Sequence, residues 1–548
     1  MRNLISLVVC VLAGALVCFS LAPFNMWILG FVSIAVFNAA LYPSTGPVQT
    51  DKLFFAKSFS YGLGLFGFAV SWVYISMTRY GGASPLLGFV MTAGFVTFLA
   101  MIFAIPLTLF HRYISLKENR WLVNIAGFSA ILLIGDWLRA WVFTGFPWAY
   151  VGYAHTQGML SGWAPIGGVL LINFILYFLS ASIAQSVLNW RLFVSTNKNF
   201  KAKMKLLPLL YLAAGIGAVI AGALFTQLNW TKQFSSIKNI ALIQPNIPQE
   251  YKWVKQYDAF ITDRLLTLSK QAQQETDTAL DIIILPEAAL PGFYSESQSV
   301  FEELIRATDT AQQELTSKNL ALKSANSATA LKAPSLITGV LFDERERFEF
   351  YNALLAINPE ADKEHELYFK QRLVPFGEYV PLEKTLRGLI DFFNLPRSYI
   401  NRGPPSTEPL SLGEIKVAPS VCYEVAYPDL VARLAHRANL LVTISNDAWF
   451  GRSIAADQHY QMAAMRAVEH RKPMLRSTNT GLTGAIDYRG RSIKTLPLFE
   501  PSSLAVKVQA RVGWTPFGKT GSWPIILLSI GLLTLIGIMR MRTRTRPN

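Results

Sequence analysis

The sequence predicts a multi-span α-helical membrane bundle of about eight helices that carries an α/β domain outside the cytoplasm. Apolar runs of spanning length occur at both ends of the 548-residue chain, and 52% of its residues are hydrophobic. The mean hydropathy of +0.32 is high for a soluble protein. Between the apolar parts lies a polar block in which strand-like and helix-like segments alternate, a pattern typical of layered α/β folds.

Eight apolar runs have or approach the roughly 20 residues that a bilayer-spanning helix requires. The run at 26–42 is short, and the run at 3–20 follows Arg2 in the manner of a signal peptide. No small-x-small cleavage site precedes the next run, so we expect the first helix to be retained. The runs lie at residues 3–20, 26–42, 55–77, 86–110, 121–141, 167–188, 206–228 and 523–539.

The charge of +15 is unevenly distributed along the chain. Residues 237–508 hold 30 Lys/Arg and 32 Asp/Glu, whereas the remainder holds 20 Lys/Arg and only three acidic residues. Nucleic-acid binding would need a basic patch on a folded domain, so no nucleic-acid partner is expected. The positive-inside rule instead places both termini in the cytoplasm and 237–508 outside it. The loops assigned to the cytoplasm contain Arg2, Lys52, Lys57, Arg112, Lys117, Arg120, Arg191, Lys198, Lys201, Lys203, Lys205, Arg540, Arg542, Arg544 and Arg546.

These observations divide the chain into three parts. We expect a membrane domain of about seven transmembrane helices at 1–230, a catalytic domain at 237–508, and a final helix with a basic cytoplasmic tail at 521–548. Within the middle part, 309–335 is rich in Ala, Ser and Lys, and we interpret it as a loop-bearing insertion. Strands are predicted at 239–246, 281–285, 335–342, 351–358, 365–370, 415–422, 439–447, 474–481 and 484–490, and helices at 256–275, 299–317 and 456–472.

Three chemically capable residues each follow a predicted strand, where polar side chains of α/β folds converge. They are Glu287, Lys370 and Cys422. Singly, each has an ordinary structural explanation, because free cysteines are often buried and charged residues at strand ends are often solvated. Together they supply a nucleophile, a base for its proton and a cation for an oxyanion, which acyl transfer through a thioester requires.

Other cysteine chemistries are less consistent with the sequence. Cys10 and Cys18 lie in an apolar run and cannot easily reach Cys422. His459, oriented by Asn446 or Asn479, could form a papain-type pair with Cys422, but this leaves Glu287 and Lys370 unexplained. The chain has no CxxC or HExxH motif, so no metal is expected, and no organic cofactor is expected either.

Several motifs resemble a known superfamily. "LPEAALP" (285–291), "YFKQRLVPFGEYVP" (368–381) and "SVCYEVAYPD" (420–429) occur in the order typical of carbon–nitrogen hydrolases, the nitrilase superfamily. "FTGFPWAYVGYAHTQ" (143–157), "SNDAWFG" (445–451), "MRAVEHRKPMLRSTNTGLTGAIDYRG" (465–490) and "GWTPF" (513–517) are similar to its membrane-bound apolipoprotein N-acyltransferase family. Leu285 departs from the family pattern, which usually has Trp before Pro-Glu.

The resemblance implies a nitrilase-like αββα sandwich and a role for each matching residue. Glu287 matches the general base, Lys370 the oxyanion-stabilising lysine and Cys422 the nucleophile, with the backbone N–H of Tyr423 as a second oxyanion donor. Glu378 matches a glutamate that positions the lysine. Trp253, Tyr423 and Glu424 match positions needed for activity near the substrate entrance, although an aromatic beside Lys252 could simply rest on lipid headgroups.

The resemblance also implies an activity, partners and a location. The expected reaction transfers an acyl chain from a membrane phospholipid, phosphatidylethanolamine in this reading, through a Cys thioester. The acceptor is the N-terminal α-amino group of diacylglyceryl-cysteine in apolipoproteins, in lipoprotein maturation. We expect a monomer in the bacterial cell inner membrane, multi-pass, with the catalytic domain facing the periplasm.

Features of the sequence are compatible with three other functions. A membrane-tethered nitrilase-type amidase could use the same Glu-Lys-Cys triad with water as acceptor. A transporter or scaffold with a relic domain is disfavoured, because the apolar runs contain few ionisable residues apart from Asp136 and Arg139. "GWTPFGKT" (513–520) matches the P-loop pattern, but Pro516 lacks an N–H for phosphate, so we interpret this segment as a hinge.

Overall fold

A computed structural model describes residues 1–43, 49–114, 121–196, 202–276, 278–322, 333–361, 365–375, 377–379 and 400–544. The chain separates into two compact units. Unit 1 comprises residues 1–74, 84–228 and 520–548, and unit 2 comprises residues 75–83 and 229–519. Each unit is described by itself below.

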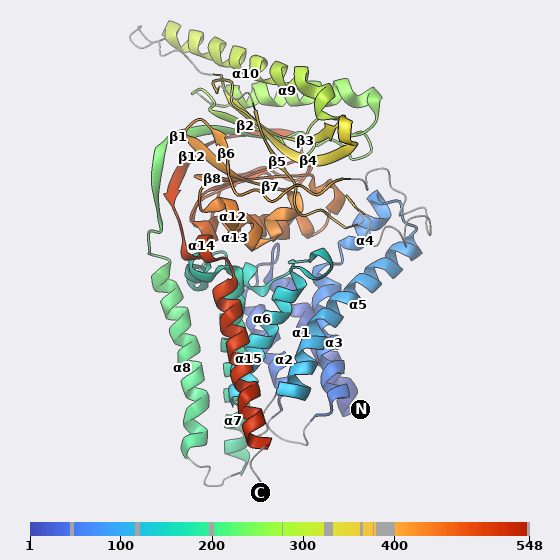
Figure 1. The fold of residues 1–548 in the computed structure, drawn as a ribbon, viewed down its shortest axis with the longest axis vertical. Coiled ribbons are helices and arrows are strands. Elements are labelled where there is room, and N and C mark those ends of the chain that lie inside the picture. The colour runs from blue at the N-terminus through green and yellow to red at the C-terminus, as the bar shows by residue number, and fades with distance from the viewer. Residues whose placement is uncertain are drawn as a thin grey trace. The chain divides into compact units, whose positions relative to one another are not determined.

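Unit 1 is built from apolar helices (Figure 1). Within the described ranges, five helices are long and apolar enough to cross a membrane, and α3 with the following bent segment provides a sixth candidate. Two shorter apolar helices, Ile28–Leu41 and Leu209–Phe225, accompany them. The helices are α1 (Arg2–Ser20), α2 (Ile28–Leu41), α3 (Asp51–Ala69), α4 (Val73–Ile75), α5 (Pro85–Leu109), α6 (Phe128–Arg139), α7 (Ala164–Thr196), α8 (Ala202–Phe225) and α15 (Trp523–Arg544).

Each of the eight predicted apolar runs coincides with one of these helices or with the bent pair. The prediction of a helical membrane bundle of about eight helices is therefore confirmed. Glycines allow α1 and α3 to pack backbone to backbone, since a Cβ on Gly14 would meet the Tyr61 carbonyl oxygen at 2.1 Å. Small residues serve the same purpose in other helix pairs inside membranes.

The two ionisable residues noted inside the apolar runs pair with each other. Arg139 and Asp136 form a buried ion pair at 2.9 Å. Asp136 also accepts hydrogen bonds from Asn173 and Tyr177 of α7, at 2.7 and 2.5 Å. Arg139 in turn donates to the carbonyl oxygens of Phe146 and Trp148, which anchors the irregular segment that follows α6. A fully partnered charge pair of this kind has a structural explanation.

Unit 2 contains two six-stranded sheets of matching design. In each sheet three adjacent strands run parallel, and antiparallel strands flank them on both sides. The first sheet has the order β12-β1-β2-β3-β4-β5: β12 (Ser502–Gly513), β1 (Thr231–Gln244), β2 (Ile282–Ile284), β3 (Ser335–Glu344), β4 (Glu349–Ile357) and β5 (His365–Phe369). The second has the order β11-β10-β9-β8-β7-β6: β11 (Ser492–Thr495), β10 (Gly484–Ile486), β9 (Met474–Thr478), β8 (Leu440–Ser445), β7 (Ile415–Val421) and β6 (Leu410–Leu412).

Helices cover the outer face of each sheet, giving an αββα sandwich (Figure 1). Helices α9 (Asp258–Gln274) and α10 (Tyr294–Leu322) lie over the first sheet, and α12 (Pro428–Ala435) and α13 (Ala455–His470) over the second. Successive side chains of a strand point to opposite faces of its sheet, so neighbouring residues of one strand belong to different cores. Ile240 and Leu242 of β1 join the core that includes the second sheet, whereas Ala241 and Ile243 pack under α9 and α10. The predicted sandwich architecture is confirmed.

Several details differ from the sequence-based expectations, including strands β6 and β11, which were not predicted. Helix α10 continues to Leu322, so the first part of the predicted insertion 309–335 is helical, and 323–332 lies outside the described residues. Strand β1 begins at Thr231, because it pairs with β12, a strand that the sequence analysis did not predict. Helix α12 was also missed: its eight residues are too few for a clear helical period.

Candidate active site

Glu287 lies on a tight turn just after β2, and this turn is pressed against strand β3. Gly339 of β3 donates its N–H to the Pro286 carbonyl oxygen at 3.1 Å. A Cβ on Gly339 would meet the Glu287 Cα at 2.5 Å, so only glycine permits this approach. The neighbouring Leu285, the departure from the family pattern, is fully buried in the core beneath α9 and α10.

Lys370 lies directly after β5 and bridges two glutamates. Its Nζ is 3.1 Å from Glu287 Oε1 and 3.0 Å from Glu378 Oε1, and the side chain is 1% exposed. Burial alone would lower the pKa of Lys370, but the two carboxylates raise it above the ordinary value. Lys370 is therefore a permanent cation, and Glu378 lies where it can hold the ammonium in place.

Asn352 of β4 is a member of this cluster that sequence reasoning missed. Its Nδ2 donates to Glu287 Oε1 at 2.7 Å and to Glu378 Oε1 at 2.8 Å. Its carbonyl oxygen accepts from the Lys370 N–H at 2.8 Å, so Asn352 contacts all three charged residues. The signal in the sequence was weak, because "YNALLAIN" looks like any buried strand with a polar residue.

The second missed residue is Lys252, which is 2% exposed and donates to the Glu287 carbonyl oxygen at 2.9 Å. Burial by itself would raise the pKa of Glu287, but Lys370, Asn352 and Lys252 together lower it below the ordinary value. Asn446 N donates to Glu287 Oε2 at 2.8 Å and favours the same ionised form. Glu287 is thus a carboxylate at neutral pH.

Cys422 stands where β7 gives way to a short 3₁₀ turn, Cys422–Ala426, and its φ is +51°. A positive φ is uncommon for a residue with a side chain and is frequent at functional sites. Its carbonyl oxygen is 3.0 Å from Nε2 of His459, which fixes the peptide on the side of the second sheet. The strand-to-turn transition therefore holds the thiol in a defined orientation.

The thiol of Cys422 belongs to the same electrostatic cluster. Burial raises the pKa of Cys422 most, the charge of Glu287 raises it further, and Lys370 lowers it in part, so the pKa lies well above its usual range. The buried charges of Glu287 and Glu378 are already matched by Lys370 and Lys252. A thiolate would add an uncompensated negative charge, so the resting thiol is neutral.

Glu424 joins the nucleophile turn to the lysine segment. Its Oε1 accepts from the N–H groups of Gln371 and Arg372, at 2.6 and 3.1 Å, and its Oε2 accepts from Val421 N at 2.9 Å. The hydroxyl of Tyr368 also contacts both oxygens. Glu424 is 0% exposed, so its carboxylate acts inside the protein, through the backbone groups that it binds. Its hydrogen bonds therefore join the segment that follows Lys370 to the end of the strand that precedes Cys422.

The other two predicted supporting residues are Tyr423 and Trp253. Tyr423 follows Cys422, is buried, and packs edge-on against Tyr427 with ring centroids 5.2 Å apart. Trp253 is half-buried in the loop before α9, next to Lys252. Lys252 connects this loop to the Glu287 turn through a hydrogen bond. Trp253 is the next residue in sequence after Lys252.

His459 does not act as the partner of a papain-type thiol in this arrangement. Its Nδ1 lies 3.1 Å from Asp447 Oδ1 and 3.0 Å from an Arg476 nitrogen, and its Nε2 faces the Cys422 carbonyl. Burial lowers the pKa of His459, and the charge of Arg476 lowers it further. The suggested orienters Asn446 and Asn479 instead hydrogen-bond each other at 3.1 Å. The His459 cluster supports the turn that carries Cys422.

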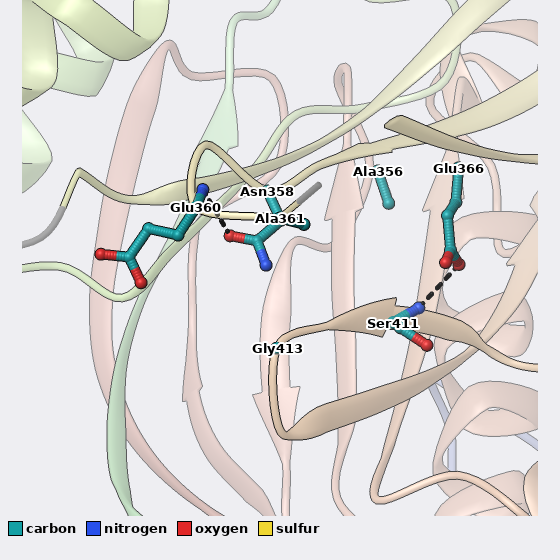
Figure 2. A pocket seen from close by; sticks show the side chains of 7 residues that line it. All are labelled: Ala356, Asn358, Glu360, Ala361, Glu366, Ser411 and Gly413. Atoms are coloured by element: carbon teal, nitrogen blue, oxygen red, sulfur yellow. Dashed lines mark hydrogen bonds between the residues drawn. The ribbon is translucent and has the colours of Figure 1, made fainter. Parts of the chain in front are cut away.

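Two further features of unit 2 lie outside the triad cluster. A pocket of ≈ 300 Å³ opens beside Glu366 and Ser411, which Figure 2 shows linked by a hydrogen bond of 2.9 Å from Ser411 N. No triad residue lines it. The P-loop-like segment ends in the short helix α14 (Pro516–Thr520), and Thr515 Oγ1, just before the helix, donates to the Glu469 carbonyl and accepts from Gly518 N. Its local polar groups are used internally, unlike those of a phosphate loop.

Comparison with known proteins matches the two parts of the chain to two family models. Residues 13–182 match the apolipoprotein N-acyltransferase N-terminal domain, and residues 239–513 match carbon-nitrogen hydrolase. An apolipoprotein N-acyltransferase from Pseudomonas putida is 36% identical over 95% of this chain and 94% of its own length. Those from Azotobacter vinelandii and Vibrio vulnificus are 34% and 33% identical over 98% and 95% of this chain, and 95% and 94% of their own lengths.

The chain belongs to the apolipoprotein N-acyltransferase family. It is a membrane-bound acyltransferase with a carbon–nitrogen hydrolase domain, and the resemblance inferred from its motifs is confirmed. Among solved structures, a carbon-nitrogen hydrolase from Helicobacter pylori G27 matches 56% of this chain and 95% of its own, with a TM-score of 0.33 and 13% identity.

Proposed function

We propose that this apolipoprotein N-acyltransferase family member moves an acyl chain from a membrane phospholipid to the N-terminal α-amino group of diacylglyceryl-cysteine in apolipoproteins. Cys422 carries the chain as a thioester between the two substrates. The observation that supports this most is the buried cluster in which one lysine contacts two carboxylates and acts electrostatically on one thiol. These groups are sufficient for acyl transfer through sulfur.

In the first half-reaction, Glu287 accepts the thiol proton as the Cys422 sulfur attacks the ester carbonyl carbon of the phospholipid. Moving the proton to Glu287 keeps the number of buried negative charges constant, which favours a coupled transfer. Lys370 and the backbone N–H of Tyr423 stabilise the resulting oxyanion. The C–O bond then breaks, and protonated Glu287 returns the proton to the departing lysophospholipid hydroxyl.

In the second half-reaction, the neutral α-amine attacks the thioester carbonyl. Glu287 takes a proton from the attacking nitrogen, the C–S bond breaks, and the proton passes to the Cys422 sulfur. The products are an amide and the original neutral thiol, so the cycle closes without a net charge change. Glu378 and Asn352 hold Lys370 and Glu287 in place through both halves.

The proposal extends to the substrates and the location. Phosphatidylethanolamine is the proposed donor, and the enzyme works as a monomer in the cell inner membrane with its catalytic part facing the periplasm. The alternation of basic loops supports this orientation. We also propose the functional division of 1–230, 237–508 and 521–548 into membrane domain, catalytic domain and terminal helix with tail.

Hydrolysis by the same triad is the second candidate, with water in place of the amine. The neutral resting thiol and the strongly bound Glu287 carboxylate do not distinguish the two acceptors. Family membership favours the amine acceptor. Hydrolysis by water is therefore an alternative outcome that the experiments below can detect.

The test uses the full chain in detergent with phosphatidylethanolamine and a synthetic diacylated lipopeptide. Mass spectrometry should detect the N-acylated peptide. Cys422→Ala should give none, and Lys370→Ala should lower the rate roughly a hundredfold to a thousandfold, the usual effect of losing one oxyanion donor. The matched control is Cys18→Ala, which removes a buried thiol from α1. A fully active Cys422→Ala enzyme would refute the proposal.

A further inference from the structure

Three arginines of unit 2 converge on the end of the first sheet where β1 begins. Arg511 of β12 donates from Nε to Thr231 Oγ1 at 2.8 Å and from a terminal nitrogen to the Thr231 carbonyl at 2.6 Å. Thr231 Oγ1 donates in turn to the carbonyl oxygen of Arg471, at 2.7 Å. The third arginine, Arg489, shares the ring of Tyr488 with Arg511: the two guanidinium carbons lie 5.4 and 3.8 Å from its centroid.

Two of these guanidinium groups have hydrogen-bond donors without acceptors. Arg471 is 3% exposed, and its Nε and one terminal nitrogen are buried without a partner among the described residues. Arg489 Nε is buried and unpartnered in the same way. Buried donors without acceptors are rare in folded proteins, and those of a charged group are the most costly.

Within the described part of the chain, no ion pair joins these three arginines to a carboxylate, and the charge of Asp487 offsets those of Arg471 and Arg511 only in part. The Oδ1 of Asp487 accepts from the backbone N–H groups of Arg489 and Arg491, at 2.8 and 2.9 Å. Burial lowers the pKa of Arg471 most and the positive charge of Arg489 lowers it further, while Tyr488 and Asp487 oppose the shift, so the pKa lies at about 10. Arg471 therefore stays charged at neutral pH while the guanidinium groups repel one another.

A purely structural role explains only part of this arrangement. Arg511 ties β12 to the first residue of β1, and a strand brace of that kind needs nothing more. Arg471 and Arg489 make no equivalent contact with their free donors. Guanidinium groups that repel one another and keep unpaired donors are typical of a site that binds an anion.

We propose that Arg471, Arg489 and Arg511 form a binding site for a phosphate group, either the phosphate of a lipid headgroup or inorganic phosphate. The planar donor fork of arginine matches the oxygens of phosphate. In sequence, β1 begins soon after the apolar helix α8, and β12 ends shortly before the apolar helix α15. The residues at this end of the sheet are therefore close in sequence to two membrane helices. The site shares no residue with the triad cluster, and the proposal does not depend on the acyl-transfer mechanism.

The test measures thermal unfolding of the full-length, delipidated protein in detergent as inorganic phosphate is added at constant ionic strength, with chloride as reference. We expect a saturable rise in Tm with phosphate, because a ligand of the folded state stabilises it. Arg489→Gln and Arg471→Gln should weaken the apparent affinity about tenfold or more, since each removes a charge-assisted hydrogen bond. The matched control is Arg491→Gln, an exposed arginine of the same turn, which should leave the affinity unchanged.

Arg489→Gln should fold normally, because it removes a cation that repels Arg471. A loss of phosphate binding in this variant therefore cannot be attributed to a folding defect. In chloride, its Tm should equal or exceed that of the wild type. If Arg471→Gln does not fold, Arg489→Gln alone decides the question.

A second arm identifies the source of the phosphate group by native mass spectrometry with phosphatidylethanolamine or a phosphate-free glycolipid. Retention of the phospholipid alone, lost in Arg489→Gln and displaced by inorganic phosphate, assigns the site to a lipid headgroup. Phosphate binding that leaves phospholipid in place assigns it to the free anion. The proposal is overturned if neither phosphate nor phospholipid binding depends on Arg489, or if Arg491→Gln weakens binding as much as Arg489→Gln.

Discussion

Asn352 connects the two carboxylates that face Lys370, and its amide contributes to the low pKa of Glu287. Replacing it with leucine should remove one hydrogen bond from each carboxylate and leave Lys370 as the one side chain of this pair that still contacts both. A hydrogen bond to a charged group contributes about 1.5–3 kcal/mol, so kcat/KM should fall roughly tenfold to a hundredfold.

The same substitution should alter the pH profile of acyl transfer. Without the amide donor the pKa of Glu287 rises, so the acidic limb of kcat/KM against pH should move to higher pH. Asn358→Leu, just beyond the end of the same strand, is the control and should retain the wild-type profile. An unchanged acidic limb in Asn352→Leu would show that Glu287 is not the group whose ionisation limits activity.

Glu424 offers a test of a buried structural carboxylate. Burial raises its pKa to about 6, although three backbone N–H groups oppose the shift. Because this folded-state pKa exceeds that of an unfolded glutamate, the contribution of Glu424 to stability is complete below about pH 4.5. That contribution is lost as the pH rises through 6, and it amounts to about 2 kcal/mol.

The measurement compares the free energy of unfolding of the wild type and Glu424→Gln between pH 4 and 7, in roughly half-unit steps across the two pKa values. The wild type should lose stability relative to the variant as the pH rises over this interval. Glu360→Gln, an exposed position, should track the wild type at every pH. A constant difference between wild type and Glu424→Gln would contradict the raised pKa.

At the level of elements, the sequence predicted those whose signal is local. Apolar runs of spanning length located the membrane helices, and polar residues after strands located Glu287, Lys370 and Cys422. Asn352 and Lys252 were missed because their importance arises from contacts between distant segments. Strand β12 was missed for the same reason: "SLAVKVQARV" becomes a strand by pairing with β1, which lies more than 250 residues away on the chain.

The segment at 75–83 makes a contact with a distant part of the chain that no local sequence pattern predicts. It belongs to unit 2, where Ser76 Oγ donates to the Trp449 carbonyl at 2.7 Å and Tyr80 packs edge-on against the Trp449 ring. Gly451 completes this contact with φ +54° and ψ −154°, a conformation that other residues rarely adopt. A Cβ on Gly451 would approach Ile75 to 3.0 Å.

Gly451→Ala should therefore strain the loop that begins at Asn446, whose N–H holds Glu287. We expect a loss of about 1–3 kcal/mol in stability, and a fall in kcat of up to roughly a hundredfold if the carboxylate moves by about 1 Å. The control is Gly413→Ala, which also has a positive φ but has only the Asn358 side chain within 4 Å of a Cβ. Equal activity of the two variants would contradict a link between this loop and Glu287.

For the whole molecule, the charge alternation predicts that residues 237–508 lie outside the cytoplasm. A reporter that is active only outside the cytoplasm should be active when fused after residue 300 and silent when fused within 192–204. The two fusions are expressed in a bacterial host, and their reporter activities are compared at equal amounts of protein. The reverse pattern would contradict the orientation and the even number of spans.

The central claim is that one thiol carries the acyl chain between two substrates. The direct measurement is the intact mass of the detergent-solubilised enzyme after incubation with phosphatidylethanolamine alone, followed by addition of lipopeptide. We expect a mass increase of one acyl group on Cys422, which a diacylated peptide with a free α-amino group removes as N-acylated product. The same peptide with an acetylated amino group should leave the thioester in place. Loss of the thioester at the same rate with either peptide, or with none, would show that water is the acceptor and contradict the transferase account.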